Sequence, residues 1–158
     1  MAAEKADTLH LVTTMTSTPI HNYIFENNGN LEFKDRSMDW GFEEKGFSSG
    51  AAYADLDNDG DLDLIVNNLN ELASIYENIS PKKNWLQISL KDNSGNTFGV
   101  GAKVEVFTGN ENQTLELQPV RGFQSSVSPR LQFGLGELAT VQSIQVIWPD
   151  GSQQILEN

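Results

Sequence analysis

The chain has 158 residues, of which 38% are hydrophobic, so it can form one domain of ordinary size or two small ones. Its net charge of −12 argues against nucleic acid as a partner, because phosphate binding depends on clustered Lys and Arg. The absence of cysteine excludes disulfides, thiol nucleophiles and Cys-based zinc sites. We expect no transmembrane segment, and no leader peptide is recognisable, which suits a mature form, a cytosolic protein or an excised fragment.

The acidity is concentrated in the first half. Residues 1–80 hold 15 acidic and 4 basic side chains, whereas residues 81–158 hold 7 acidic and 6 basic ones. This shift in composition predicts two regions of different chemistry, with a break near Ser80-Pro81-Lys82-Lys83-Asn84. Residues 1–20 are expected to be either a linker or an orphan β-strand, and Thr8–Thr14, with Leu9 and Leu11 against His10 and Val12, is the candidate strand.

A hairpin is predicted next, because Asn28-Gly29 lies between the alternating runs Tyr23–Asn27 and Leu31–Asp35. The first run, YIFEN, has a counterpart 51 residues later in SIYEN, over Ser74–Asn78. A period near 50 residues is typical of propeller blades and similar β arrays. Chance similarity between two short strands is the alternative.

Residues 55–63 read DLDNDGDLD and predict a loop that binds a hard cation. Its carboxylates are Asp55, Asp57, Asp59, Asp61 and Asp63. Four of them occupy loop positions 1, 3, 5 and 9, and Gly60 at position 6 permits a sharp turn. Without an ion these carboxylates would repel one another across a few ångströms. The alternative is a solvated acidic turn.

We expect Ca²⁺ as the cofactor, since it accepts six to eight oxygen ligands in flexible geometry, whereas Mg²⁺ prefers a tight octahedron. The expected ligands are the side chains of Asp55, Asp57, Asp59 and Asp63, the main-chain carbonyl of Asp61, and water. The loop is not an EF-hand, because Val66 stands where that motif needs a bidentate Glu, and its flanks predict strand, loop, strand.

The second half is predicted to be antiparallel β-structure, because short alternating runs are separated by turns every 8–12 residues. The residues expected to share buried faces are Leu86, Ile88 and Leu90; Val100, Ala102, Val104 and Val106; Leu131, Phe133 and Leu135; and Ile144, Val146 and Trp148. Trp40, Trp85 and Trp148 could stack on sugar rings, but tryptophan at a strand position is more often part of a core.

A possible ligand loop begins at Arg121. It comprises Arg121, Phe123, Gln124 and Ser125, which combine a cation, an aromatic ring and polar groups in a poor strand sequence. Such loops on a β scaffold are common recognition sites. The alternatives are a loop packed internally, and pairing of Arg121 and Arg130 with Glu116 or Glu137.

These motifs resemble two known families in fixed order. The run Tyr23–Gly29, the run Gly50–Ala54 and the aspartate loop are similar to FG-GAP/VCBS repeats of integrin-α-type propellers. The segments NWL (84–86), GVGAKV (99–104), RGFQS (121–125), PRLQFGLG (129–136) and WPDG (148–151) resemble the ASPIC/UnbV domain. This pairing is typical of the cartilage acidic protein family and its bacterial relatives.

The resemblance implies an all-β fold. A partial β-propeller with a calcium loop (21–80) would precede a small antiparallel β-sandwich or barrel (84–158). It also implies a secreted or cell-surface protein. Family members carry several repeats and this chain has about one and a half, so we expect the C-terminal piece of a larger protein.

We predict a non-enzymatic, calcium-binding module for adhesion or recognition, whose partner is an extracellular protein or glycan. One alternative is a carbohydrate-binding accessory domain of a surface polysaccharide system. Another is a hydrolase, but that needs a pair of carboxylates with divergent pKa values, and none stands out beside the aspartate loop. The sequence also lacks the Gly-x-Ser-x-Gly, Walker and His-Glu-x-x-His motifs.

Overall fold

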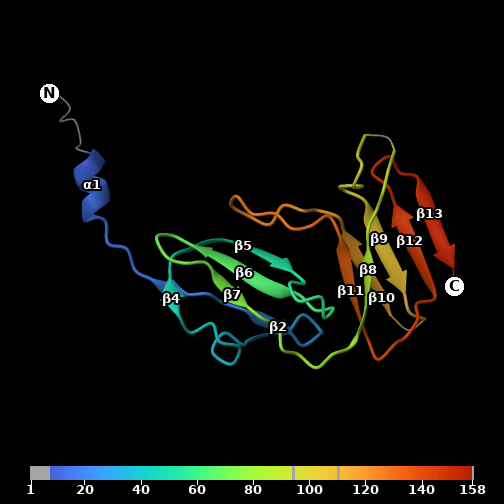
Figure 1. The fold of residues 1–158 in the computed structure, drawn as a ribbon, viewed down its shortest axis with the longest axis horizontal. Coiled ribbons are helices and arrows are strands. Elements are labelled where there is room, and N and C mark those ends of the chain that lie inside the picture. The colour runs from blue at the N-terminus through green and yellow to red at the C-terminus, as the bar shows by residue number, and fades with distance from the viewer. Residues whose placement is uncertain (1–7, 94, 110, 158) are drawn as a thin grey trace. The chain divides into compact units, whose positions relative to one another are not determined.

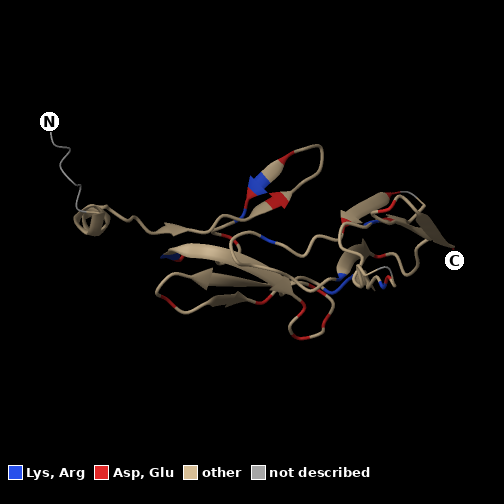
Figure 2. Cartoon of the chain, turned by 90° about the horizontal axis from the view of Figure 1, so that it is seen from above, with Lys and Arg blue, Asp and Glu red and all other residues tan. Residues whose placement is uncertain are grey.

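The computed structural model describes residues 8–93, 95–109 and 111–157 and is almost entirely β-structure (Figure 1). The chain divides into two compact units, residues 1–48 and 49–158. The domain limits that we expect at 1–20, 21–80 and 84–158 stay a prediction. Acidic residues outnumber basic ones by 22 to 10 and recur along the ribbon, as Figure 2 shows.

The first unit contains one helix and two small pairs of strands. Its elements are α1 (Thr8–Thr14), β1 (Ile20–His21), β2 (Phe25–Asn27), β3 (Phe33–Asp35) and β4 (Lys45–Gly46). Strand β1 pairs with β4, and β2 pairs with β3, both antiparallel. The hairpin predicted around Asn28-Gly29 is therefore confirmed, although its connection also takes in Asn30 and Leu31, both with positive φ.

The strand predicted over Thr8–Thr14 is wrong, because this segment is the helix α1. The hydroxyl of Thr13 donates to the carbonyl of Leu9 at 2.9 Å, and that of Thr14 donates to the carbonyl of His10 at 2.8 Å. No residue of the helix is buried. Local bonds of this kind satisfy polar groups without the partner strand that a β ladder requires.

The second unit begins with a three-stranded sheet in the order β5-β6-β7. Its strands are β5 (Ser48–Ala54), β6 (Asp63–Asn68) and β7 (Ser74–Tyr76). The aspartate loop connects β5 to β6, which confirms the predicted strand, loop, strand arrangement. Val66 of β6 is buried and the preceding Leu64 and Ile65 are half-buried, as expected for this apolar run. The sheet therefore holds both ends of the loop.

Two further antiparallel sheets follow. One pairs β8 (Asn84–Ile88) with β11 (Leu131–Gly136). The other has the order β10-β9-β12-β13, with bounds Asn112–Glu116, Lys103–Phe107, Ser143–Ile147 and Gln153–Glu157. Figure 1 shows these strands in yellow to red. None of the sheets formed by the described residues closes into a barrel. The all-β fold is therefore confirmed, and its sheets are open.

One hydrophobic core joins the two sheets. Its buried members are Ala102, Val104, Val106, Leu117, Leu131, Phe133 and Val146, and the half-buried side chains packed against them include Leu86, Ile88, Leu90, Leu135, Ile144 and Trp148. The alternation predicted this core correctly except at one position. Val100 is 38% exposed because it lies in a turn, where Asn96 bonds both its N–H and its carbonyl.

Two of the three tryptophans are not core residues. Trp148 packs against the core, but Trp40 is 46% exposed and Trp85 is 42% exposed. The expectation that a strand tryptophan is buried is therefore wrong for Trp85, which belongs to β8. Trp85 instead lies against Gly60 of the aspartate loop.

Phe133→Ala should lower the free energy of unfolding by about 3–5 kcal/mol, because Phe133 is fully buried and its removal leaves a cavity. Phe98→Ala is the matched control; Phe98 is 57% exposed, so its loss should change stability by no more than about 0.5 kcal/mol. Urea unfolding of the two variants measures both values. Equal destabilisation by the two substitutions would contradict the assigned core.

Candidate metal centre

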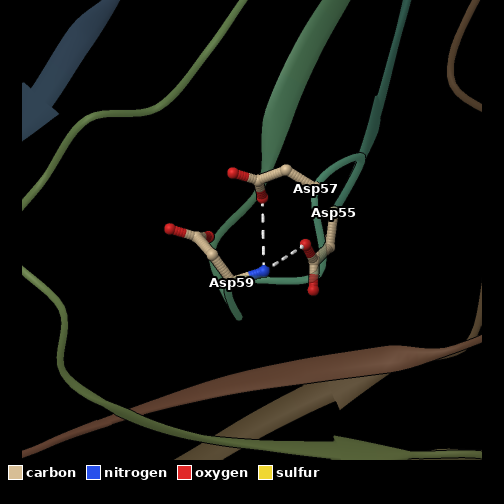
Figure 3. Close-up of side chains that lie close together, drawn as sticks. All are labelled: Asp55, Asp57 and Asp59. Carbon is tan, nitrogen blue, oxygen red and sulfur yellow. Dashed lines mark hydrogen bonds between the residues drawn. The ribbon is translucent and has the colours of Figure 1, made fainter.

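Three carboxylates converge in the loop between β5 and β6. One oxygen each from Asp55, Asp57 and Asp59 lie within 4.8 Å of one another (Figure 3). The alternation of side chains and the positive φ values of Asn58 and Gly60 curl the backbone around this point. The loop thus gathers hard oxygen donors from consecutive odd positions.

Backbone amides partly offset the repulsion between these carboxylates. Asp55 accepts the N–H of Asp59 at 3.1 Å and that of Gly60 at 3.2 Å. Asp57 also accepts the N–H of Asp59, at 3.2 Å, and Asp59 accepts the N–H of Asp61 at 3.2 Å. Figure 3 draws the two bonds that end on the amide of Asp59. Each carboxylate is oriented by the loop's own backbone before any ligand is considered.

Lys82 supplies the only ion pair of the loop among the described residues. Its Nζ lies 3.5 Å from Oδ2 of Asp59, and its side chain is 76% exposed. An exposed pair of this kind contributes little to stability. It leaves most of the negative charge of five aspartates without a partner of opposite sign.

Asp63 has a different place from the other aspartates. It is 3% exposed, and its two oxygens accept the N–H of Leu56 and the N–H of Asn78, both at 2.9 Å. It therefore ties the start of the loop to the segment after β7. The three-carboxylate group does not include Asp63 or Asp61, so the five-residue ligand set that we expect stays a prediction.

Asp61 provides evidence that the loop fits a cation. Its Oδ1 is buried and has no hydrogen-bond partner among the described residues. Burial, followed by the charges of Asp59, Asp63, Asp57 and Asp55, raises the pKa of Asp61 above its ordinary value. A buried carboxylate oxygen without a donor is costly, and a divalent cation would relieve both that cost and the repulsion. All the donors are oxygens, which suits Ca²⁺.

The loop also touches the C-terminal part of its own unit. The carbonyl of Gly60 accepts a hydrogen bond from Nε2 of Gln132 at 2.6 Å. A Cβ at Gly60 would lie 1.6 Å from Nε1 of Trp85, so the indole rests directly against the glycine backbone. This contact explains why Trp85 is outside the core. Neither Trp85 nor Gln132 has a local sequence signal that marks it as a neighbour of the loop.

The predicted ligand loop divides into an anchored base and an exposed tip. Arg121 donates to the hydroxyl of Tyr53 from Nε at 3.0 Å and from Nη2 at 2.6 Å, and it also bonds the carbonyls of Gln118 and Val120. Among the described residues no ion pair joins Arg121 or Arg130 to Glu116 or Glu137, the alternative that we considered.

Phe123 at the tip is 69% exposed, and Gln124 has a φ of 49°. Ser125 shapes the turn, because its Oγ donates to the carbonyl of Phe123 at 2.9 Å. The exposure of Phe123 argues against a tip packed internally. Whether the tip binds a ligand stays a prediction.

Two segments of the chain match models of known protein families. Residues 11–66 match the family model described as FG-GAP-like repeat, and residues 92–158 match the model described as ASPIC and UnbV. Among the described residues no helix has the length and apolarity needed to cross a bilayer.

A stretch of 114 residues is 33% identical to cartilage acidic protein 1 of Xenopus tropicalis and 32% identical to the proteins of that name from Homo sapiens and Mus musculus. The alignments cover 69% of this chain, and the chain spans 17% of the length of these curated relatives. The predicted resemblance is confirmed: the chain carries an FG-GAP-like repeat followed by an ASPIC and UnbV domain.

Proposed function

We propose that the chain is a calcium-binding, non-enzymatic recognition module of a larger secreted or cell-surface protein. The observation that carries the proposal is the convergence of Asp55, Asp57 and Asp59. It is supported by Oδ1 of Asp61 in the same loop, which is buried and has no hydrogen-bond partner among the described residues. The much greater length of the relatives supports a role as one part of a longer protein. The match to a repeat family and to a second β family supports recognition rather than catalysis.

In this proposal the ion is held by the side chains of Asp55, Asp57 and Asp59. Asp61 and Asp63 complete the set that the sequence predicts. Asp63 also accepts hydrogen bonds from the backbone N–H groups of Leu56 and Asn78, so its loss would affect both folding and ion binding. When bound, Ca²⁺ supplies positive charge at the centre of the loop and stabilises the β5–β6 connection.

Ca²⁺ should bind the chelator-treated chain in preference to Mg²⁺, as measured by isothermal titration calorimetry. Asp57→Asn and Asp59→Asn should each weaken Ca²⁺ binding by at least about tenfold, because each removes a charged donor. Asp150→Asn is the matched control. It removes the same charge from another Asx-type turn, where Asp150 accepts from Ser152. Unchanged Ca²⁺ affinity in both loop variants would refute the site.

The bound ion should be structural. Free Ca²⁺ at 100 times its dissociation constant should stabilise the chain by about 2.7 kcal/mol, so chelator should lower Tm. In Asp57→Asn, Ca²⁺ should no longer raise Tm. In chelator this variant should melt no earlier than the parent, because the substitution removes one of the charges that repel one another in the loop. Differential scanning calorimetry with and without Ca²⁺ gives all four values. A Tm that is independent of chelator despite confirmed metal removal would contradict a structural ion.

We further propose that the exposed tip of the 121–126 loop recognises the partner. Phe123 and Gln124 present an aromatic ring and an amide, while Arg121 and Ser125 fix the base. A Cβ at Gly50 would lie 2.3 Å from Oγ of Ser125 and 2.7 Å from the carbonyl of Phe123, so the loop is seated on β5. An extracellular protein or glycan is the class of partner that we expect.

Phe123→Ala should abolish capture of a ligand found on an array of matrix proteins and glycans, and it should change stability by no more than about 0.5 kcal/mol because the ring is exposed. Arg121→Ala should instead lower Tm, since it removes the bonds to Tyr53. Phe98→Ala, another exposed phenylalanine, is the control for capture. Full capture by Phe123→Ala would exclude the tip as the recognition surface.

A further inference from the structure

A cleft of ≈ 570 Å³ lies within the second unit, next to the ion loop, whose Asp55 contributes to its lining. It is bounded by the end of β5 and the start of the aspartate loop on one side, and by residues of β8, β10 and β11 on the other. Its volume falls within the range of about 300–1,000 Å³ that is usual for small-molecule sites. The residues that bear on its chemistry are Tyr53, Trp85, Gln87, Glu116, Arg130 and Gln132.

Two aromatic rings in the lining are fixed in place. Trp85 is held against the backbone of Gly60 and is still 42% exposed. Tyr53 is held by Arg121, whose guanidinium bonds the hydroxyl and lies 5.3 Å from the ring centroid. A ligand would therefore meet rings that need little ordering on binding, and this pre-organisation favours affinity.

The polar side chains of the lining carry planar groups, and their positive and negative charges nearly balance. Gln87, Glu116 and Arg130 carry flat amide, carboxylate and guanidinium groups. Nη1 of Arg130 makes a long bond, 3.4 Å, to Oε1 of Gln87. The lining holds two cations, Arg121 and Arg130, against two carboxylates, Glu116 and Asp55, of which Asp55 is also a proposed Ca²⁺ ligand. In a chain of net charge −12, this balance favours a neutral polar ligand over a highly charged one.

We propose that this cleft binds a neutral oligosaccharide. A sugar ring presents C–H groups on its face, which suit the negative face of an aromatic ring, and hydroxyls on its edge, which suit planar donors and acceptors. The cleft offers both kinds of surface within one volume. The site is distinct from the tip of the 121–126 loop, because Phe123 and Gln124 do not line it.

The test is titration of the whole chain, in Ca²⁺, with maltohexaose, cellohexaose, mannohexaose and chitohexaose. Calorimetry should detect at least one hexaose with a Kd of about 1 mM or tighter. Trp85→Ala should weaken that binding by at least about tenfold. Trp40→Ala should leave it unchanged, because Trp40 is similarly exposed, at 46%, but belongs to the other unit. No binding of any of the four hexaoses would overturn the proposal.

A second variant separates binding from folding, since Trp85→Ala also removes the contact with Gly60. Arg130→Met changes an exposed residue and should weaken hexaose binding at unchanged Tm, whereas Lys103→Met, an exposed cation on β9, should not. Phe123→Ala should bind the hexaose normally, so failure of the 121–126 tip as a recognition surface would leave this proposal standing. Full hexaose binding by both Trp85→Ala and Arg130→Met, or binding of a sulfated heparin hexasaccharide alone, would overturn it.

Discussion

The buried carboxylate of Asp63 is the constraint on which the ion loop and its surroundings depend. A carboxylate that is 3% exposed must have a donor for each oxygen, and the amides of Leu56 and Asn78 are those donors. Hydrogen bonds to an ionised acceptor are among the stronger ones in proteins. They close the loop over the start of β6 and draw the end of β7 to the same point, using protein groups alone.

The aspartates of the loop therefore have different partners. Because Asp63 points inward to the backbone, the loop must curl, and Asp55, Asp57 and Asp59 are left converging on one another. Amide donors and Lys82 offset part of the resulting repulsion. The remainder is the energetic reason to expect a cation, and Asp61 adds to it through a buried oxygen that no described donor reaches. One motif therefore contains both a folding device and a site for an ion.

The sequence predicted those features that depend on short-range patterns. The Asn28-Gly29 hairpin and the alternation around Val104 and Phe133 became structure as expected. Of the five aspartates in the predicted ion site, Asp55, Asp57 and Asp59 converge. Helix α1 was missed because the apolar pattern of seven residues does not distinguish a strand from a short helix.

Contacts between distant residues could not be predicted. The bond from Gln132 to Gly60 joins residues 72 positions apart, and the pair of Arg121 with Tyr53 joins residues 68 apart. No local period marks such partners. The exposure of Trp85 and the hydrogen bonds of Asp63 to Leu56 and Asn78 depend on the same kind of packing. Spacing alone therefore assigned Trp85 to the core and could not predict these two bonds of Asp63.

Two glycines, Gly50 within β5 and Gly60 in the aspartate loop, lie directly against residues from later in the chain. A side chain at Gly50 would collide with Ser125, and one at Gly60 would collide with Trp85. Both collisions involve residues that follow the glycine in the chain by 25 positions or more. A residue larger than glycine at either position would force one of these neighbours to move. The two glycines therefore make the sequence of the β5–β6 segment depend on that of the sheets that follow it.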